Sequence, residues 1–87
     1  MNSAQIESIL KRRCGDEFLG VFAIDQLPTI LPARRPLMLV CNTDPHHRPG
    51  EHWVALYIDE HGEYFDFFGN RPHETFRKFL NKHCLRW

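Results

Sequence analysis

The side chains best suited to chemistry in this sequence are those of His52 and Asp66. His52 stands immediately before the strongest strand pattern of the chain, residues 53–58, and Asp66 lies in the next strand pattern. If the two strands pair as a hairpin, the imidazole and the carboxylate come close together. A carboxylate among aromatic side chains is costly to bury unless a donor satisfies it, and an imidazole N–H is such a donor.

This pair predicts acid–base chemistry. A carboxylate that binds one ring nitrogen fixes the tautomer of His52 and supports its charged form, so the other ring nitrogen can act as base for a nucleophile. The alternative is purely structural, with Asp66 facing solvent and His52 at the surface. Spacing alone leaves both interpretations open.

A zinc site is a second interpretation, because His46, His47 and His52 follow Cys41 within a short stretch. The spacing matches neither a Cys-x-x-Cys pair nor two histidines one helical turn apart, and adjacent histidines rarely bind one ion together. A solvated loop accounts better for His46 and His47. We therefore predict no metal and no cofactor.

The three cysteines, Cys14, Cys41 and Cys84, are each more typical of a small core hydrophobe than of a nucleophile. Three cysteines cannot all pair, so we expect free thiols. No stretch of about 20 apolar residues is present, which excludes a hydrophobic membrane span. The polar N-terminal stretch does not resemble a signal peptide, and we expect an intracellular protein.

The apolar pattern predicts the elements that position the pair. We expect a helix over residues 2–13 that ends at Cys14-Gly15, irregular chain over 16–36 and a buried strand over 37–41. A loop over 44–51 then leads into two antiparallel strands, 53–58 and 64–68. A last helix is expected to begin at Pro72 and to extend to Trp87. Its apolar face consists of Phe76, Phe79, Leu80 and Cys84.

The fold class is therefore α+β, with an N-terminal helix, a small and mainly antiparallel sheet of about three strands, and a C-terminal helix. A chain of 87 residues with 43% hydrophobic residues is enough for a single domain, 1–87, and too apolar for a disordered tail. The formal net charge is +0, so the chain has no general attraction to nucleic acid or anionic lipid.

Four segments, in order, give the chain a family resemblance. They are Cys14-Gly15 with Phe18-Leu19-Gly20, Leu39-Val40-Cys41-Asn42-Thr43, Gly50-Glu51-His52-Trp53-Val54-Ala55, and Tyr64-Phe65-Asp66-Phe67-Phe68-Gly69. Together they resemble the adenovirus protease (adenain) family of cysteine peptidases, which includes relatives encoded by virus-like DNA transposons. The resemblance covers nearly the whole chain. The His52-Trp53 pair and the strand that carries Asp66 indicate the family together, and each is a weak signal alone.

The resemblance implies part of the papain-like, adenain-type fold, with residues 1–87 as the N-terminal half of the peptidase domain. His52 would be the general base, Asp66 its orienting acid, and Trp53 and Asn42 would line the site. The implied reaction is hydrolysis of peptide bonds. In that reaction a thiolate attacks the scissile carbonyl, and a Gln side chain helps to stabilise the oxyanion.

The Gln and the nucleophilic Cys that the family places after the acid have no counterpart here. Cys84 is the only cysteine after Asp66 and is followed by Leu85 rather than by a glycine, while both glutamines precede His52. We therefore expect a cysteine-type endopeptidase by family, without a nucleophile in this chain and without activity of the chain alone. The alternative is a non-catalytic protein-interaction module, or the decayed remnant of a viral or transposon protease.

The implied partner is a peptide or protein substrate. The resemblance also implies DNA and an activating peptide as partners, which the neutral charge does not support. The implied location is the cytoplasm or nucleus, or the virion for a viral protein.

Overall fold

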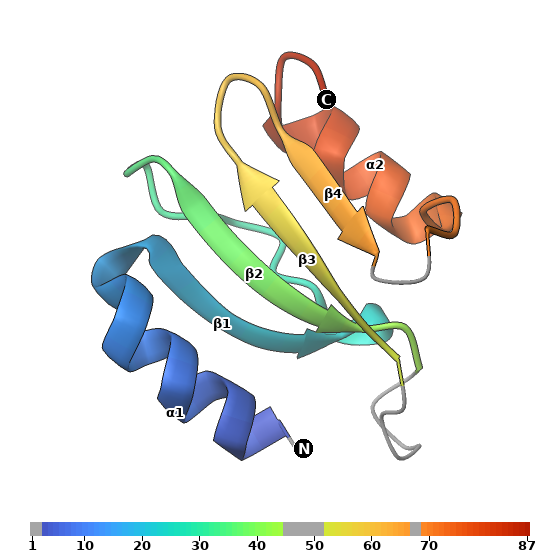
Figure 1. Ribbon diagram of the computed structural model, residues 1–87. Helices are drawn as coiled ribbons and strands as arrows, with labels where there is room; N and C mark the ends of the chain where they lie inside the picture. The colour runs from blue at the N-terminus through green and yellow to red at the C-terminus, as the bar shows by residue number, and fades with distance from the viewer. Residues whose placement is uncertain (1–2, 45–51, 67–68) are drawn as a thin grey trace.

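The computed structural model describes residues 3–44, 52–66 and 69–87. Two helices flank a four-stranded sheet in the strand order β1-β2-β3-β4 (Figure 1). The elements are α1 (Ser3–Cys14), β1 (Phe18–Ala23), β2 (Leu37–Asn42), β3 (Trp53–Ile58), β4 (Glu63–Asp66) and α2 (Glu74–His83), with short 3-10 turns at Gly15–Glu17 and Ile24–Gln26. The α+β class predicted from the sequence is confirmed.

The first helix ends where the sequence indicates. α1 stops at Cys14, and Gly15 adopts a φ of 59°, a left-handed conformation that glycine reaches without steric cost. Of the predicted range 2–13, only residue 2 lies outside the described residues. α1 lies alongside β1 at one edge of the sheet (Figure 1).

The sheet has one strand more than predicted. β1 occupies part of the stretch 16–36 that was expected to be irregular, and it pairs in parallel with β2. The expectation was wrong because the register shifts between Phe18 and Gly20, which hides the alternation of a regular strand. Gly20 gives the Phe22 ring room, because a Cβ there would lie 3.2 Å from that ring.

Parallel neighbours need a long connection, and residues 27–36 follow the second 3-10 turn to provide it. Its half-buried Leu27 and Leu31 pack against the core, so this connection helps to cover one face of the sheet.

The predicted strands after this connection are confirmed. β2 is buried at every position except Met38, as expected for a strand covered on both faces. β3 and β4 form the predicted antiparallel hairpin, in which Val54 lies opposite Asp66. Residues 67–68 of the predicted strand 64–68, and residues 45–51 of the predicted loop, lie outside the described residues.

The last helix is shorter than predicted at both ends. It begins at Glu74, because His73 acts as its N-cap and accepts a hydrogen bond from the Thr75 backbone N–H at 3.0 Å; Pro72 therefore precedes the helix. It ends at His83, and the following residues turn back to the β3–β4 turn. There the Leu85 N–H donates to the carbonyl of Glu60 at 3.0 Å.

The core lies between α2 and one face of the sheet. The apolar side of α2 was predicted correctly, since Phe76, Phe79, Leu80 and Cys84 are all buried. They pack against alternate residues of β2 and β3, namely Leu37, Leu39, Cys41, Val54, Leu56 and Ile58. Because paired residues share a face, Asp66 opposite Val54 lies on this core-facing side.

Candidate active site

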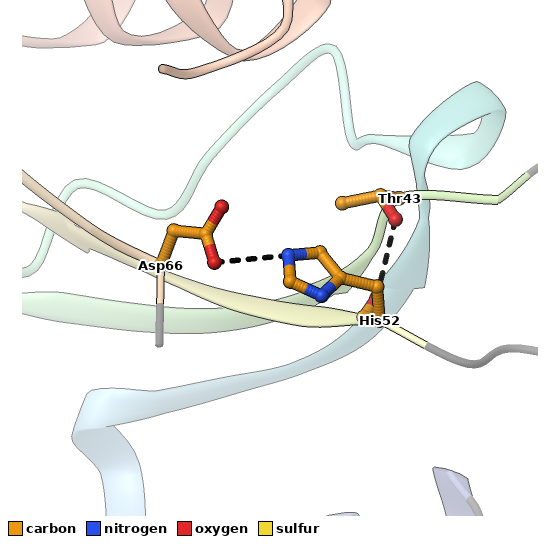
Figure 2. Close-up of polar contacts among 3 residues, drawn as sticks. All are labelled: Thr43, His52 and Asp66. Atoms are coloured by element: carbon orange, nitrogen blue, oxygen red, sulfur yellow. Dashed lines mark hydrogen bonds and ion pairs between the residues drawn. The ribbon is translucent and has the colours of Figure 1, made fainter. Parts of the chain in front are cut away.

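The β3–β4 hairpin brings His52 and Asp66 together, as the sequence predicts. His52 stands one residue before β3 and Asp66 is the last residue of β4. Val54, two residues after His52, pairs with Asp66. Side chains two positions apart in a strand point to the same face, so the imidazole and the carboxylate meet. Nε2 of His52 lies 2.9 Å from Oδ1 of Asp66 (Figure 2).

The two side chains differ in their access to water. The Asp66 side chain is 4% exposed and that of His52 is 23% exposed. A carboxylate removed this far from water requires a compensating donor or cation, and the imidazole is positioned to supply it. The imidazole itself keeps contact with the solvent, where a reacting group could reach it.

The backbone on either side of the pair is anchored. The carbonyl of His52 accepts from the N–H of Thr43 at 3.0 Å and from its hydroxyl at 3.4 Å, which extends the β2–β3 ladder by one step (Figure 2). The carbonyl of Asp66 accepts from the N–H of Gly69 at 2.9 Å, where Gly69 has a φ of 72°. These bonds restrict how far either side chain can move away from the other.

Tyr64 is a neighbour of the pair that the sequence analysis did not single out. It stands two residues before Asp66 on the same face of β4, and its ring packs against that of Phe76 at 5.9 Å. Burial raises the pKa of Tyr64 to about 12, with smaller contributions from the negative charge of Asp66 and from Cys41 once that thiol is ionised. The phenol therefore stays protonated at neutral pH, and the spacing of two residues from Asp66 is the signal that could have identified it.

The other two predicted site residues are not grouped with the pair. Asn42 and Trp53 lie opposite each other in the β2–β3 register. Each is adjacent to a residue of the core-facing side, Cys41 and Val54, so their side chains belong to the other face of the sheet. The side-chain oxygen of Asn42 accepts from the N–H of Asp44 at 2.9 Å, which stabilises the bend after β2.

The chain has three cysteines, and one of them, Cys41, shares the core-facing side of the sheet with the pair because it lies opposite Val54. All three are free, as predicted. Cys41 is fully buried, and burial raises its pKa to about 12, so its thiol stays protonated. Cys14 lies before β1, and Cys84 packs against Gly62 in the β3–β4 turn. Both therefore lie at the end of the sheet opposite to His52, about 17 Å away along a six-residue strand.

The described part of the chain contains no group of three or more His, Cys, Asp or Glu side chains that could hold a metal ion. His46 and His47, two of the residues weighed for zinc, lie outside the described residues. Within the described residues, no helix has the length and apolar character needed to cross a membrane.

No family model, curated protein or solved structure matches this chain. The geometry of the pair and the residues around it are therefore the basis for a function.

Proposed function

We propose that this chain supplies the general base and the orienting acid of a cysteine-type endopeptidase resembling adenain. The observation that carries the proposal is the 2.9 Å contact between Nε2 of His52 and Oδ1 of Asp66, with the carboxylate nearly removed from water. In nucleophilic catalysis, a base that is itself oriented by a third group is the recurring arrangement.

The roles follow from which ring nitrogen meets the acid. Because Nε2 faces Asp66, Nδ1 is the nitrogen that would take the proton from an attacking thiol. The resulting thiolate would attack the scissile carbonyl, and the imidazolium would then give its proton to the departing amine. Asp66 would hold the ring orientation and stabilise the imidazolium without taking the proton itself.

The thiol in this proposal comes from a segment other than residues 3–44, 52–66 and 69–87. The cysteines of the chain support this: burial keeps the Cys41 thiol protonated, and Cys14 and Cys84 lie at the far end of the sheet. By the resemblance, that segment would carry a Gln followed by a Cys-Gly pair. The proposed substrate is an extended peptide, and the net charge of +0 gives no support for DNA.

A chimera tests the proposal. The chain is joined at Trp87 to the Gln- and Cys-bearing half of an adenain-type peptidase, and cleavage of a panel of fluorogenic peptides is measured. We expect cleavage that is abolished by His52→Ala and reduced about 10²- to 10⁴-fold by Asp66→Asn. Glu63→Gln, on the exposed side of the same strand, is the matched control and should leave the rate unchanged.

Two outcomes would refute the proposal. Cleavage by the folded chimera that survives His52→Ala would show that the imidazole is not the base. Cleavage by the 87-residue chain alone, lost in His52→Ala, would refute the claim that the nucleophile comes from another segment.

A second candidate function is a non-catalytic module that binds another protein chain at β4. It is favoured by one specific observation, namely that Phe65 on this edge strand is 62% exposed. A groove of about 700 Å³ beside β4 adds Pro72, Arg71 and Trp87 to this surface. Exposed strand edges and apolar patches are typical sites of association. A monomer by light scattering that binds no hydrophobic dye would count against this candidate.

A further inference from the structure

A second pocket lies at the opposite end of the molecule from the proposed catalytic pair. It has a volume of about 540 Å³ and is found where the end of α2, the β3–β4 turn and the chain before β2 come together. Arg35, Lys82 and His83 line it, together with Asp59 and Glu60. None of these residues contributes to the proposed peptidase site.

The two permanent cations of this pocket are held by backbone carbonyls of one segment. The Lys82 ammonium donates to the carbonyl of Thr29 at 3.3 Å. The Arg35 guanidinium donates to the carbonyls of Pro32 and Arg34, the latter at 2.9 Å. Carbonyl oxygens position a cation without cancelling its charge, so both side chains keep a full positive charge at the pocket.

His83 lines the same pocket and has unused hydrogen-bonding capacity. Its Nε2 atom is buried and has no hydrogen-bond partner among the described residues. The ring packs against that of Phe79, with centroids 4.6 Å apart, which fixes its orientation. Burial lowers the pKa of His83, and the positive charges of Lys82 and Arg35 lower it further.

Two carboxylates, those of Asp59 and Glu60, also line the pocket. The two charges that shift the pKa of His83, those of Lys82 and Arg35, are both positive. The Asp59 carboxylate accepts from the N–H of Glu60 at 2.9 Å, which orients it on the β3–β4 turn and leaves its charge in place. The negative end of the α2 dipole accounts for basic residues in its last turn, Lys82 and His83, but not for Arg35, which is 47 positions away from Lys82 in the sequence.

We propose that this pocket binds a small oxyanion of the phosphate class, held by Arg35, Lys82 and the ring N–H of His83. A doubly charged tetrahedral anion accepts charge-assisted hydrogen bonds from several donors at once, and guanidinium and ammonium groups are the usual partners of phosphate. The anion would also give the buried Nε2 a partner and would favour the protonated ring.

Titration of the purified chain with inorganic phosphate, followed by NMR of the His83 ring and of the backbone amides, tests the proposal. We expect saturable shifts centred on residues 81–83, with binding weakened at least about threefold by Arg35→Gln and by Lys82→Gln. Lys78→Gln is the matched control, because Lys78 is on the same helix and pairs with Glu74 at 3.5 Å on the exposed side. It should bind as the unchanged chain does.

Two further arms identify the chemistry of the ligand. Acetate at equal ionic strength should bind more weakly than phosphate if the site requires a dianion. Sulfate keeps its charge between pH 5.5 and pH 7.5. Sulfate binding that is tighter at the lower pH, and that loses this pH dependence in His83→Gln, would therefore report protonation of the ring. The other charged or titratable groups that line the pocket are Arg35, Lys82, Asp59, Glu60 and Cys84.

Equal shifts in Lys78→Gln and Lys82→Gln, or shifts that do not saturate, would mean an adventitious ion only and would overturn the proposal. If Arg35→Gln does not fold, Lys82→Gln decides the outcome, since Lys82 is exposed. The result is independent of the peptidase proposal, because no residue is shared between the two sites.

Discussion

The C-terminal residues after α2 are docked on the β3–β4 turn, and Gly62→Ala tests this docking. A Cβ added at Gly62 would lie 2.5 Å from Sγ of Cys84, 3.2 Å from its Cβ and 3.3 Å from Cβ of Trp87. Gly62 is buried, and its N–H donates to the carbonyl of Arg86 at 2.7 Å. The added methyl group therefore has no space unless Cys84 or the tail moves.

The expected cost follows from two opposing effects. Overpacking a filled site costs about 1–3 kcal/mol. Replacing a glycine whose backbone suits alanine returns about 0.4–1 kcal/mol through the unfolded state. These ranges give a net loss of unfolding free energy of about 0–2.6 kcal/mol, centred near 1.3 kcal/mol, out of roughly 4–13 kcal/mol for a domain of 87 residues. At the centre of that range, the melting temperature should fall by about 5–10 °C for a domain of this size.

Urea and thermal unfolding followed by circular dichroism measure this loss. The control is the same substitution in a Cys84→Ala background, which removes the sulfur that makes the closest contact. Gly62→Ala should cost less in that background, so the two substitutions should be non-additive. Equal cost in both backgrounds, or no cost in either, would refute the close packing of Cys84 on the turn.

Two other predictions concern the core. Phe76 is fully buried, so Phe76→Ala should lower the free energy of unfolding in urea by about 3–5 kcal/mol. Ile30→Ala is the control: its side chain is 86% exposed, and the loss should be less than about 0.5 kcal/mol. Similar losses in the two variants would contradict the described core. The folded state keeps the thiol of Cys41 protonated up to a pKa of about 12, against 9.0 for an ordinary cysteine. The free energy of unfolding should therefore be unaffected by this thiol below pH 9. It should fall by about 4 kcal/mol as the pH rises to 12, because the thiol ionises in the unfolded chain but not in the folded one, and Tyr64 acts in the same direction. Unfolding as a function of pH should show a smaller decline in Cys41→Ala, and an equal decline would exclude burial of this thiol as the cause.

The central hairpin and the His52–Asp66 contact could be predicted because both depend on local pattern. Residues 53–58 are rich in aromatic and β-branched residues, which favours a strand, and the turn at 59–62 fixes which residues of β4 lie opposite them. Once that register is set, an imidazole two residues before Val54 and a carboxylate opposite Val54 must share a face.

The elements that were missed depend on tertiary contacts. β1 has a register shift after Phe18, and its pairing partner lies about 20 positions further along the chain, so nothing local marks it as a strand. The end of α2 at His83 is decided by the hydrogen bonds of the following residues to Glu60 and Gly62, which a helical pattern does not reveal. Arg35 is grouped with Lys82 and His83 for the same reason, because the chain before β2 and the end of α2 meet only through tertiary contacts.

Nitrogen NMR on ring-labelled protein shows which nitrogen of the His52 ring carries the proton, and so measures whether Asp66 orients the imidazole. The contact of Nε2 with Asp66 predicts that the neutral ring carries its proton on Nε2, and that Asp66→Ala removes this preference while Glu63→Ala preserves it. A ring that carries its proton on Nδ1, or a preference unchanged by Asp66→Ala, would contradict the account.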